Sequence, residues 1–203
     1  MKKLYCDMDG VLVDFAAGAL KLVNTALKDQ KYASWKEYKL LIERLEKEGR
    51  NQILPIDLEK PEYRGRQEEE VMPEARNFMK ALIAEAGSNW WATLPWMPGG
   101  KRLWENIAKY NPRILSAPMD PLEECEKGKQ EWIDINLVPI HQPCEVVFTD
   151  EKFHLAEGNV LIDDFEINTV PWERNGGLPV IHHHESTSST IKLVEEIIED
   201  ATA

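Results

Sequence analysis

Short apolar runs recur along the chain, and stretches with helical spacing separate them. The runs cover residues 3–8, Arg113–Ser116, Glu145–Thr149, Val160–Asp163 and Leu178–His182. Each run has the length and composition of a buried β-strand. Because short apolar strands that alternate with helices form parallel sheets wound on both faces, the pattern predicts an α/β fold with a doubly wound parallel sheet.

Between these runs, apolar residues recur at steps of three and four, which is the spacing of one helix face. Such stretches predict helices over Val13–Val23, Trp35–Lys47, Pro73–Ile83, Lys101–Tyr110, a segment through Trp132, and Ser189–Glu199. Prolines and glycines predict a loop over Trp90–Gly100. The acidic run Glu68–Glu70 is expected on a solvated helix face.

The residues that end the predicted strands carry polar chemistry. They are Asp7, Ser116, Thr149-Asp150 and Asp163-Asp164. In parallel sheets of this kind, ligands bind beyond the carboxyl ends of the strands. Several strands therefore finish in groups that suit metal and phosphate chemistry.

Asp7 and Asp9 are two residues apart at the end of the first strand, so both carboxylates project to the same side of an extended chain. Gly10 then allows a sharp turn and a close backbone approach to a ligand. Two neighbouring carboxylates do not both ionise cheaply, which lets one act as nucleophile and the other as acid and base. An ordinary turn is the alternative. A calcium loop would place its glycine five residues after the first ligand, not three.

The other strand ends each allow two readings. One carboxylate of Asp163-Asp164 could complete an oxygen site for magnesium, or the pair could cap a helix. The hydroxyl of Ser116 could bind a phosphoryl oxygen, or act as a cap. Lys152 could neutralise a phosphoryl group, or be an exposed lysine. Neighbouring strand residues point to opposite sides, so His182–His184 are expected as exposed imidazoles rather than one metal site.

Composition narrows the classes of function. A formal net charge of −12 argues against a general role in binding nucleic acid polymers or anionic membranes. Cys6, Cys125 and Cys144 form no CxxC pair and are expected as free thiols in a reducing compartment. No apolar stretch approaches the roughly 20 residues that span a bilayer. These features predict a cytoplasmic protein.

Together, these motifs resemble the haloacid dehalogenase superfamily of phosphatases. The first motif stands here as Asp7-Met8-Asp9-Gly10-Val11-Leu12, the second as Ile114-Leu115-Ser116, the third as Lys152 and the fourth as Leu161-Ile162-Asp163-Asp164. The resemblance covers nearly the whole chain. It implies a Rossmann-like core formed by residues 1–14 and 91–203, with a small helical cap, residues 15–90, inserted after the first strand.

A closer resemblance is to the 5'(3')-deoxyribonucleotidase branch. It is carried by Asp14-Phe15, Leu94–Gly100, Gly128–Trp132, Asn168, Trp172 and Gly176-Gly177. Ala117 stands where that branch commonly has a serine, and Gly100 where it has an alanine. The substrate implied is a nucleoside or deoxynucleoside monophosphate. Four aromatic residues are candidates to stack on its base, namely Phe15, Trp90, Trp91 and Trp96.

The superfamily resemblance also implies roles for the site residues. Asp7 attacks phosphorus to form an aspartyl-phosphate, and Asp9 first protonates the leaving oxygen and then activates water. Magnesium is held by Asp7, the Asp9 carbonyl and one residue of the pair Asp163-Asp164, where Asp164 is expected as the ligand.

The phosphoryl group is expected to be bound by Ser116, the backbone at Ala117, Lys152 and Lys129. A phosphatase of a sugar phosphate or another small metabolite is the alternative within enzymes. A binding module on an idle phosphatase scaffold is the alternative of another class. A small phosphomonoester is the expected partner, and a homodimer is left open.

Overall fold

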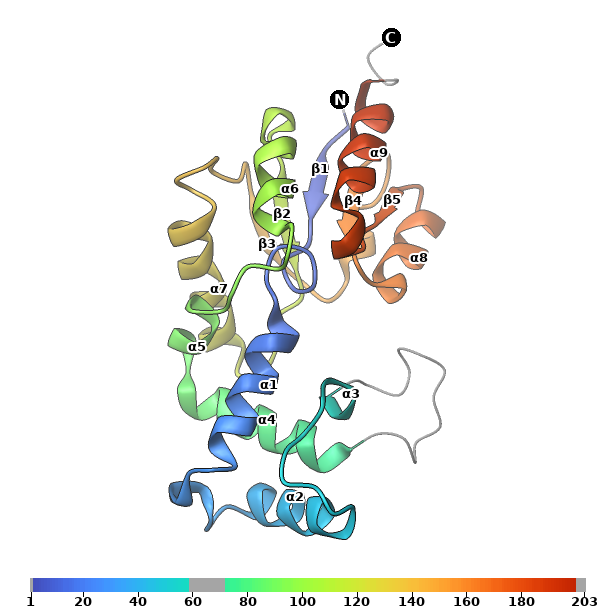
Figure 1. Cartoon of the computed structure of the whole chain (residues 1–203). Helices are drawn as coiled ribbons and strands as arrows, with labels where there is room; N and C mark the ends of the chain where they lie inside the picture. Colours follow the sequence, from blue (N-terminus) through green and yellow to red (C-terminus); the bar gives the residue numbers. More distant parts are fainter. Residues whose placement is uncertain (1, 59–71, 200–203) are drawn as a thin grey trace. The chain divides into compact units, whose positions relative to one another are not determined.

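A sheet of five parallel strands forms the centre of the fold, in the order β3-β2-β1-β4-β5 (Figure 1). The strands are β1 (Leu4–Cys6), β2 (Arg113–Ser116), β3 (Val146–Phe148), β4 (Val160–Asp163) and β5 (Leu178–Ile181). All five correspond to the apolar runs of the sequence, and every pairing is parallel. The predicted α/β fold with a parallel sheet is confirmed.

The strand order creates a switch point beside β1. From β1 the chain adds β2 and then β3 on one side, and afterwards adds β4 and β5 on the other. Cys6 is in register with Ile114 of β2 and with Ile162 of β4, so the carboxyl ends of the three strands lie together. Ligands of doubly wound sheets bind in the crevice outside such a switch point.

Helices flank the sheet on both faces. They are α6 (Gly100–Ile107), α7 (Leu122–Asn136), α8 (Glu166–Arg174) and α9 (Thr187–Glu199). Short 3-10 turns follow α6 (η4, Ala108–Tyr110), β3 (η5, Lys152–Leu155) and β5 (η6, His184–Ser186). Figure 1 shows α6 and α9 side by side on one face, where they pack against each other.

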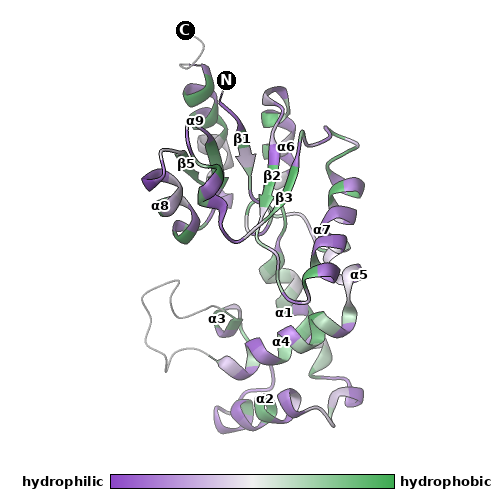
Figure 2. Ribbon diagram, turned by 180° about the vertical axis from the view of Figure 1, so that it is seen from behind, coloured by the Kyte–Doolittle hydropathy of each residue, from purple (hydrophilic) through white to green (hydrophobic). Residues whose placement is uncertain are grey.

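Successive side chains along each strand point to opposite faces of the sheet, so the strands contribute to the core on both faces. Tyr5, Leu115 and Leu161 are buried in one cluster with Trp172 of α8, and the rings of Tyr5 and Trp172 meet edge to face at 5.7 Å between centroids. Figure 2 shows hydrophobic colour along strands such as β2, whereas α7 and α8 carry both colours. The three central strands β1, β2 and β4 are largely buried, the edge strands β3 and β5 are mostly half-buried, and the helices are amphipathic.

Three helices differ from the sequence prediction, and one of them is α3 (Pro55–Leu58), a single turn in a stretch with no predicted element. Helix α8 was not expected, because it exposes Ile167 and Val170 while it buries Thr169 and contains Pro171, so its apolar stripe is weak. The stretch Trp90–Gly100, expected as a loop, begins inside a short helix, α5 (Ser88–Ala92). The other predicted helices agree with the structure to within a few residues at their ends.

Phe15–Trp90 form a second compact unit, distinct from the sheet unit formed by Met1–Asp14 and Trp91–Ala203. The computed structural model describes residues 2–58 and 72–199. The acidic run Glu68–Glu70 lies outside them. No described helix is both long and apolar enough to cross a bilayer. That the second unit acts as a cap stays a prediction.

Helix α4 (Pro73–Ala86) organises the second unit. It packs against α1 (Phe15–Ala26), α2 (Lys36–Lys47) and α3 (Pro55–Leu58), and η1 (Gln30–Tyr32) links α1 to α2. Phe78 of α4 is fully buried, and the rings of Tyr32, Trp35 and Tyr38 surround it edge to face. Aromatic edge-to-face packing thus forms part of the core of this helical unit, beside buried aliphatic residues such as Leu41 and Leu82.

Candidate active site

Asp7 continues β1 by one residue beyond the last strand position. Its backbone N–H donates to the carbonyl of Ile162 at 2.9 Å, which keeps Asp7 in register with β4. Its carboxylate is buried, and Oδ1 accepts hydrogen bonds from the Met8 N–H at 2.8 Å and from the Lys152 ammonium at 2.9 Å. The strand end thus holds an acid inside the protein rather than on its surface.

Asp163 is the last residue of β4 and is fully buried. Its Oδ2 accepts from the Lys152 ammonium at 2.7 Å and from the Asn168 amide at 3.0 Å. Its Oδ1 accepts from the Phe165 N–H and from the same amide, both at 3.0 Å. Since a carboxylate offers about four lone-pair sites, these bonds fill the acceptor capacity of Asp163.

Lys152 lies in η5, the turn that follows β3, and only 2% of it is exposed. Its ammonium forms ion pairs with Asp7 and Asp163 together. Burial alone would lower the pKa of this lysine, but the two carboxylates outweigh burial and raise the pKa. Lys152 therefore remains charged, and the alternative that it is an ordinary exposed lysine is wrong.

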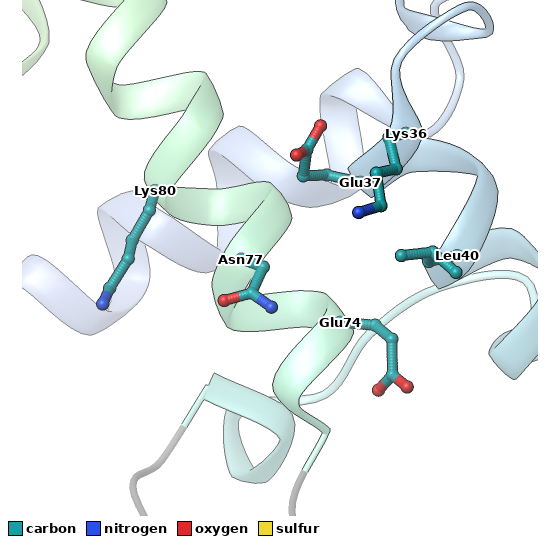
Figure 3. A pocket seen from close by; sticks show the side chains of 6 residues that line it. All are labelled: Lys36, Glu37, Leu40, Glu74, Asn77 and Lys80. Carbon is teal, nitrogen blue, oxygen red and sulfur yellow. The ribbon is translucent and has the colours of Figure 1, made fainter.

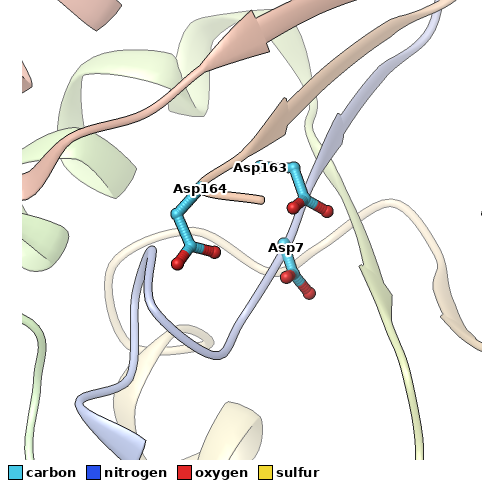
Figure 4. Close-up of side chains that lie close together, drawn as sticks. All are labelled: Asp7, Asp163 and Asp164. Atoms are coloured by element: carbon cyan, nitrogen blue, oxygen red, sulfur yellow. The ribbon is translucent and has the colours of Figure 1, made fainter. Parts of the chain in front are cut away.

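Asp7, Asp163 and Asp164 each offer one carboxylate oxygen, and these three atoms lie within 4.8 Å of one another (Figure 4). One ammonium cannot compensate three carboxylates. Burial raises the pKa of Asp164 to about 8, and the charges of Asp7 and Asp163 add to this. Burial likewise raises the pKa of Asp7 to about 7, against the opposing effect of Lys152. A cluster of oxygen donors with excess negative charge is the donor set that a hard cation prefers.

Asp9 lies in the turn that follows Asp7. Three successive N–H groups, of Val11, Leu12 and Val13, donate to the carbonyl of Met8 and close this turn. The Asp9 side chain is 31% exposed, and its Oδ2 accepts from the Lys129 ammonium at 2.7 Å. Its Oδ1 is buried and has no hydrogen-bond partner within the part of the chain that the structure describes.

Lys129 comes from α7 and joins the turn to the end of β2. Besides Asp9, its ammonium donates to Ser116 Oγ at 2.8 Å and to the Ala117 carbonyl at 2.7 Å. These three bonds use all three N–H groups of the lysine, which is 2% exposed. The ammonium also lies 5.3 Å from the centre of the Trp91 ring. The second strand end and the turn are thus tied together by one buried cation.

The structure therefore brings together seven of the residues proposed from the sequence: Asp7, Asp9, Ser116, Lys129, Lys152, Asp163 and Asp164. The backbone of Ala117 joins them through its carbonyl. Thr149 is tied to this group through its backbone, whose N–H donates to the Ser116 carbonyl at 3.0 Å. Thr149 Oγ1 accepts from the Glu151 N–H at 3.1 Å, which is an ordinary turn bond, and Asp150 is exposed.

Asn168 is the residue whose contact with the site was not foreseen. It lies one turn into α8 and donates to both oxygens of Asp163. In the sequence, Asn168 enters through the branch resemblance, and its spacing of five residues from Asp163 does not reveal a contact until the start of α8 is known. Because α8 was not predicted, this contact could not be either.

The four aromatic candidates divide between the two units. Phe15 and Trp90 belong to the helical unit, where their rings meet edge to face at 5.5 Å. Trp91 is buried, and Trp96 packs on Trp132 at 4.8 Å and donates to Asn136 at 3.1 Å. These contacts give Trp91 and Trp96 packing roles. Stacking on a base stays a prediction for all four residues.

His182 corrects one expectation. It is fully buried, and its Nδ1 lies 2.9 Å from Thr190 Oγ1. Burial lowers the pKa of this imidazole to about 4. His183 and His184 are exposed, as expected. The prediction failed for His182 because α9 covers that side of β5, which a strand pattern alone does not reveal.

A separate surface depression lies in the helical unit. Lys36, Glu37 and Leu40 of α2 line it together with Glu74, Asn77 and Lys80 of α4 (Figure 3). Its walls mix both signs of charge with one exposed leucine, and it contains none of the site residues named above. It offers no arrangement that resembles the cluster at the strand ends.

No protein-family model and no curated protein matches the sequence. Solved structures match its fold. A HAD-family hydrolase from Deinococcus radiodurans, solved with bound phosphate and sodium, is 10% identical with a TM-score of 0.50, over 97% of this chain and 96% of that one. The chain has the haloacid dehalogenase hydrolase fold.

Two further structures support this assignment of the fold. A proposed phosphoglycolate phosphatase from Lactobacillus delbrueckii subsp. bulgaricus is 13% identical with a TM-score of 0.52, over 97% of this chain and 98% of that one. A HAD-superfamily hydrolase from Ehrlichia chaffeensis is 11% identical with a TM-score of 0.50, over 98% and 99%. Identities this low establish a shared fold and nothing finer.

Proposed function

We propose that the protein is a magnesium-dependent phosphatase that forms a covalent aspartyl-phosphate on Asp7. The observation that carries this proposal is the pairing of two acids with two buried lysines at one sheet edge. Asp7 pairs with Lys152, and Asp9 pairs with Lys129 beside the hydroxyl of Ser116. A nucleophile, an acid and base, and cations for a phosphoryl group are thereby supplied together.

Asp7 is the nucleophile in this proposal. Its Oδ1 already accepts from the Met8 N–H and from Lys152, so Oδ2 is the oxygen assigned to attack phosphorus. The two bonds to Oδ1 fix the carboxylate plane, which fixes the direction of attack. The new bond joins Oδ2 to phosphorus while the bond from phosphorus to the leaving oxygen breaks.

Asp9 is the acid and base. Lys129 holds its Oδ2, and the buried Oδ1 is the oxygen that would give a proton to the leaving group and later take one from water. Water then attacks the aspartyl-phosphate, releases inorganic phosphate and restores Asp7. A carboxylate with one oxygen held and the other unused suits this double role.

The residues fit a magnesium ion. Asp7 and Asp164 would hold it with the carbonyl of Asp9, whereas the lone pairs of Asp163 are already filled by Lys152, Asn168 and the Phe165 N–H. We therefore assign Asp164 as the direct ligand and Asp163 as the residue that positions Lys152. When bound, magnesium offsets the negative charge of the cluster and favours ionised Asp7.

Lys129 and Ser116 would bind the phosphoryl oxygens. The ammonium donates to Asp9, Ser116 and Ala117, so all three of its N–H groups are in use. An entering phosphoryl oxygen would replace one of these acceptors with a more negative one. Ala117 offers only backbone, so a second side-chain hydroxyl is missing at this position.

For the substrate we propose a nucleoside or deoxynucleoside monophosphate. The support is the sequence resemblance to the 5'(3')-deoxyribonucleotidase branch, with the aromatic pair Phe15 and Trp90 as candidates to stack on the base. A sugar phosphate or another small metabolite phosphate is the second candidate. One neighbour of the same fold is named as a proposed phosphoglycolate phosphatase, which favours that class.

Hydrolysis of p-nitrophenyl phosphate tests the activity. We expect turnover that needs magnesium, stops with a chelator and is absent in Asp7→Asn. A wild-type protein that binds magnesium but hydrolyses no phosphomonoester would favour the idle-scaffold alternative. A panel of deoxynucleotides, ribonucleotides and sugar phosphates then separates the substrate classes. Faster turnover of sugar phosphates than of every nucleotide would overturn the nucleotide proposal.

A further inference from the structure

The turn after Asp7 touches the end of β4 through a glycine. A Cβ atom built on Gly10 would collide with Oδ2 of Asp164 and lie 2.5 Å from its Cγ and 2.7 Å from its Oδ1. A Cβ atom essentially never lies closer than 3.0 Å to a heavy atom of a residue that is not its chain neighbour. The Asp164 carboxylate therefore occupies the space that any side chain at position 10 would need.

We infer that Gly10 is a positioning residue, whose missing side chain lets the Asp164 carboxylate reach the acidic cluster with Asp7 and Asp163. The collision includes Cγ as well as the oxygens. Rotation about the Cβ–Cγ bond of Asp164 leaves Cγ in place and therefore cannot relieve the collision. Only a different rotamer about the Cα–Cβ bond would, and that rotation carries the carboxylate away from its present place in the cluster.

The backbone segments at Gly10 and Asp164 are both held by hydrogen bonds, so they cannot separate without breaking some of them. The Gly10 N–H donates to the Val13 carbonyl at 2.9 Å inside the turn that closes on Met8. On the other side, Asp164 follows Asp163, whose carboxylate is held by Lys152, Asn168 and the Phe165 N–H. The same turn contains Asp9, whose carboxylate is paired with Lys129. A side chain at position 10 would therefore disturb Asp164, Asp9 or both.

A second glycine provides a matched control. Gly10 has φ +82° and Gly158, in the same unit, has φ +70°, so alanine is strained by the backbone at both positions. A Cβ on Gly158 would meet nothing within 4 Å, in contrast to Gly10. The variant Gly158→Ala thus measures backbone strain alone, and any further effect of Gly10→Ala reports the collision with Asp164.

The inference rests on the proposed function only for the identity of the ion. Titration calorimetry with magnesium chloride on the full chain gives the first readout. We expect Gly10→Ala to bind magnesium about tenfold or more weakly than the wild type, in the range seen for residues that orient metal ligands. Gly158→Ala should bind as the wild type does. A folded Gly10→Ala protein with unchanged magnesium affinity would overturn the inference.

A double-mutant cycle with Asp164→Ala gives a readout that needs neither metal nor activity. Removing the carboxylate should reduce the stability loss caused by Gly10→Ala to that caused by Gly158→Ala, as measured by urea unfolding in chelator. An equal loss with and without Asp164 would overturn the inference.

If Gly10→Ala alone does not fold, the double variant decides. Folding of the double variant supports the collision, and its failure contradicts it. If the wild type binds no magnesium, the metal part of the proposed function fails, and the cycle still tests Gly10 on its own.

Discussion

The candidate site has two halves, each with its own buried lysine, and the two halves differ in how the lysine balances the charge of its acids. In the acidic half (Asp7, Asp163, Asp164 and Lys152), one ammonium serves two of three carboxylates. In the paired half (Asp9, Ser116 and Lys129), one ammonium meets one carboxylate, one hydroxyl and the Ala117 carbonyl. The acidic half has excess negative charge when its acids ionise, and the paired half has none.

The difference assigns separate tasks to the two halves. An excess of negative charge inside a protein is stable only with a cation or extra protons. Burial raises the pKa values of Asp7 and Asp164, and the neighbouring carboxylates raise them further. A charge-balanced group needs neither. We therefore expect ion binding to depend on the acidic half, and proton transfer and phosphoryl binding on the paired half.

The largest effect should follow from Lys152→Met, which keeps much of the side-chain volume and removes the charge. Asp7 and Asp163 would be left buried without a cation, and breaking a buried ion pair in this way costs about 3–5 kcal/mol. Urea unfolding at pH 8 in chelator measures this loss. The loss should be smaller at pH 6, where Asp7 can be protonated. A loss below about 1 kcal/mol, as for a surface pair, would contradict the account of the acidic half.

The second effect concerns pH and metal. Asp7 and Asp164 have folded-state pKa values raised from 3.8 to about 7 and about 8, so the folded protein holds more protons than the unfolded chain between these values. The contribution of these two acids to stability should therefore be fully present below about pH 4 and be lost progressively as pH rises from there through 7 and 8.

Thermal unfolding in chelator from pH 5 to 8.5 measures this slope. Asp164→Asn should flatten it, and magnesium at pH 8 should restore most of the lost stability in the wild type. A metal-free protein whose stability rises over this range would show that the acids of the cluster are not in conflict.

The smallest effect on stability should come from Lys129→Met. The Asp9 side chain is 31% exposed, so water can replace the lost ammonium, and we expect a cost of about 1–2 kcal/mol. Turnover should fall about a hundredfold or more, because the acid and base loses its position. Magnesium affinity should stay as in the wild type. A fall in affinity as large as that of Asp164→Asn would show that the two halves are not separate.

The acidic half was largely predictable from the sequence. Asp7 and Asp163 each end an apolar run, and the carboxyl ends of parallel strands must meet at one edge. Their proximity therefore follows from the strand pattern and the sheet class. The pairing of Lys152 with both acids does not follow, because it depends on how the short turn after β3 folds back over the sheet.

The paired half, and the residues that contact the site from helices, were harder to predict from the sequence. Lys129 is one of several charged residues on α7, and only packing reveals that it is buried and faces Asp9 and Ser116. The contact of Asn168 with Asp163 was not predicted because α8 has a weak apolar stripe. His182 was misjudged because burial on β5 depends on α9. Strand ends can be read from local pattern, whereas contacts made by helix side chains depend on long-range packing.

The central claim is that Asp7 carries the phosphoryl group, and a trapped intermediate tests it most directly. In Asp9→Asn, p-nitrophenyl phosphate should still react with Asp7, because its leaving group needs no proton, but water should not be activated to release the product. Acid quenching and mass spectrometry should then find one added phosphoryl group on the peptide that contains Asp7, and none in Asp7→Asn. A phosphoryl group on another residue, or turnover by Asp9→Asn with no adduct at any time, would contradict the account.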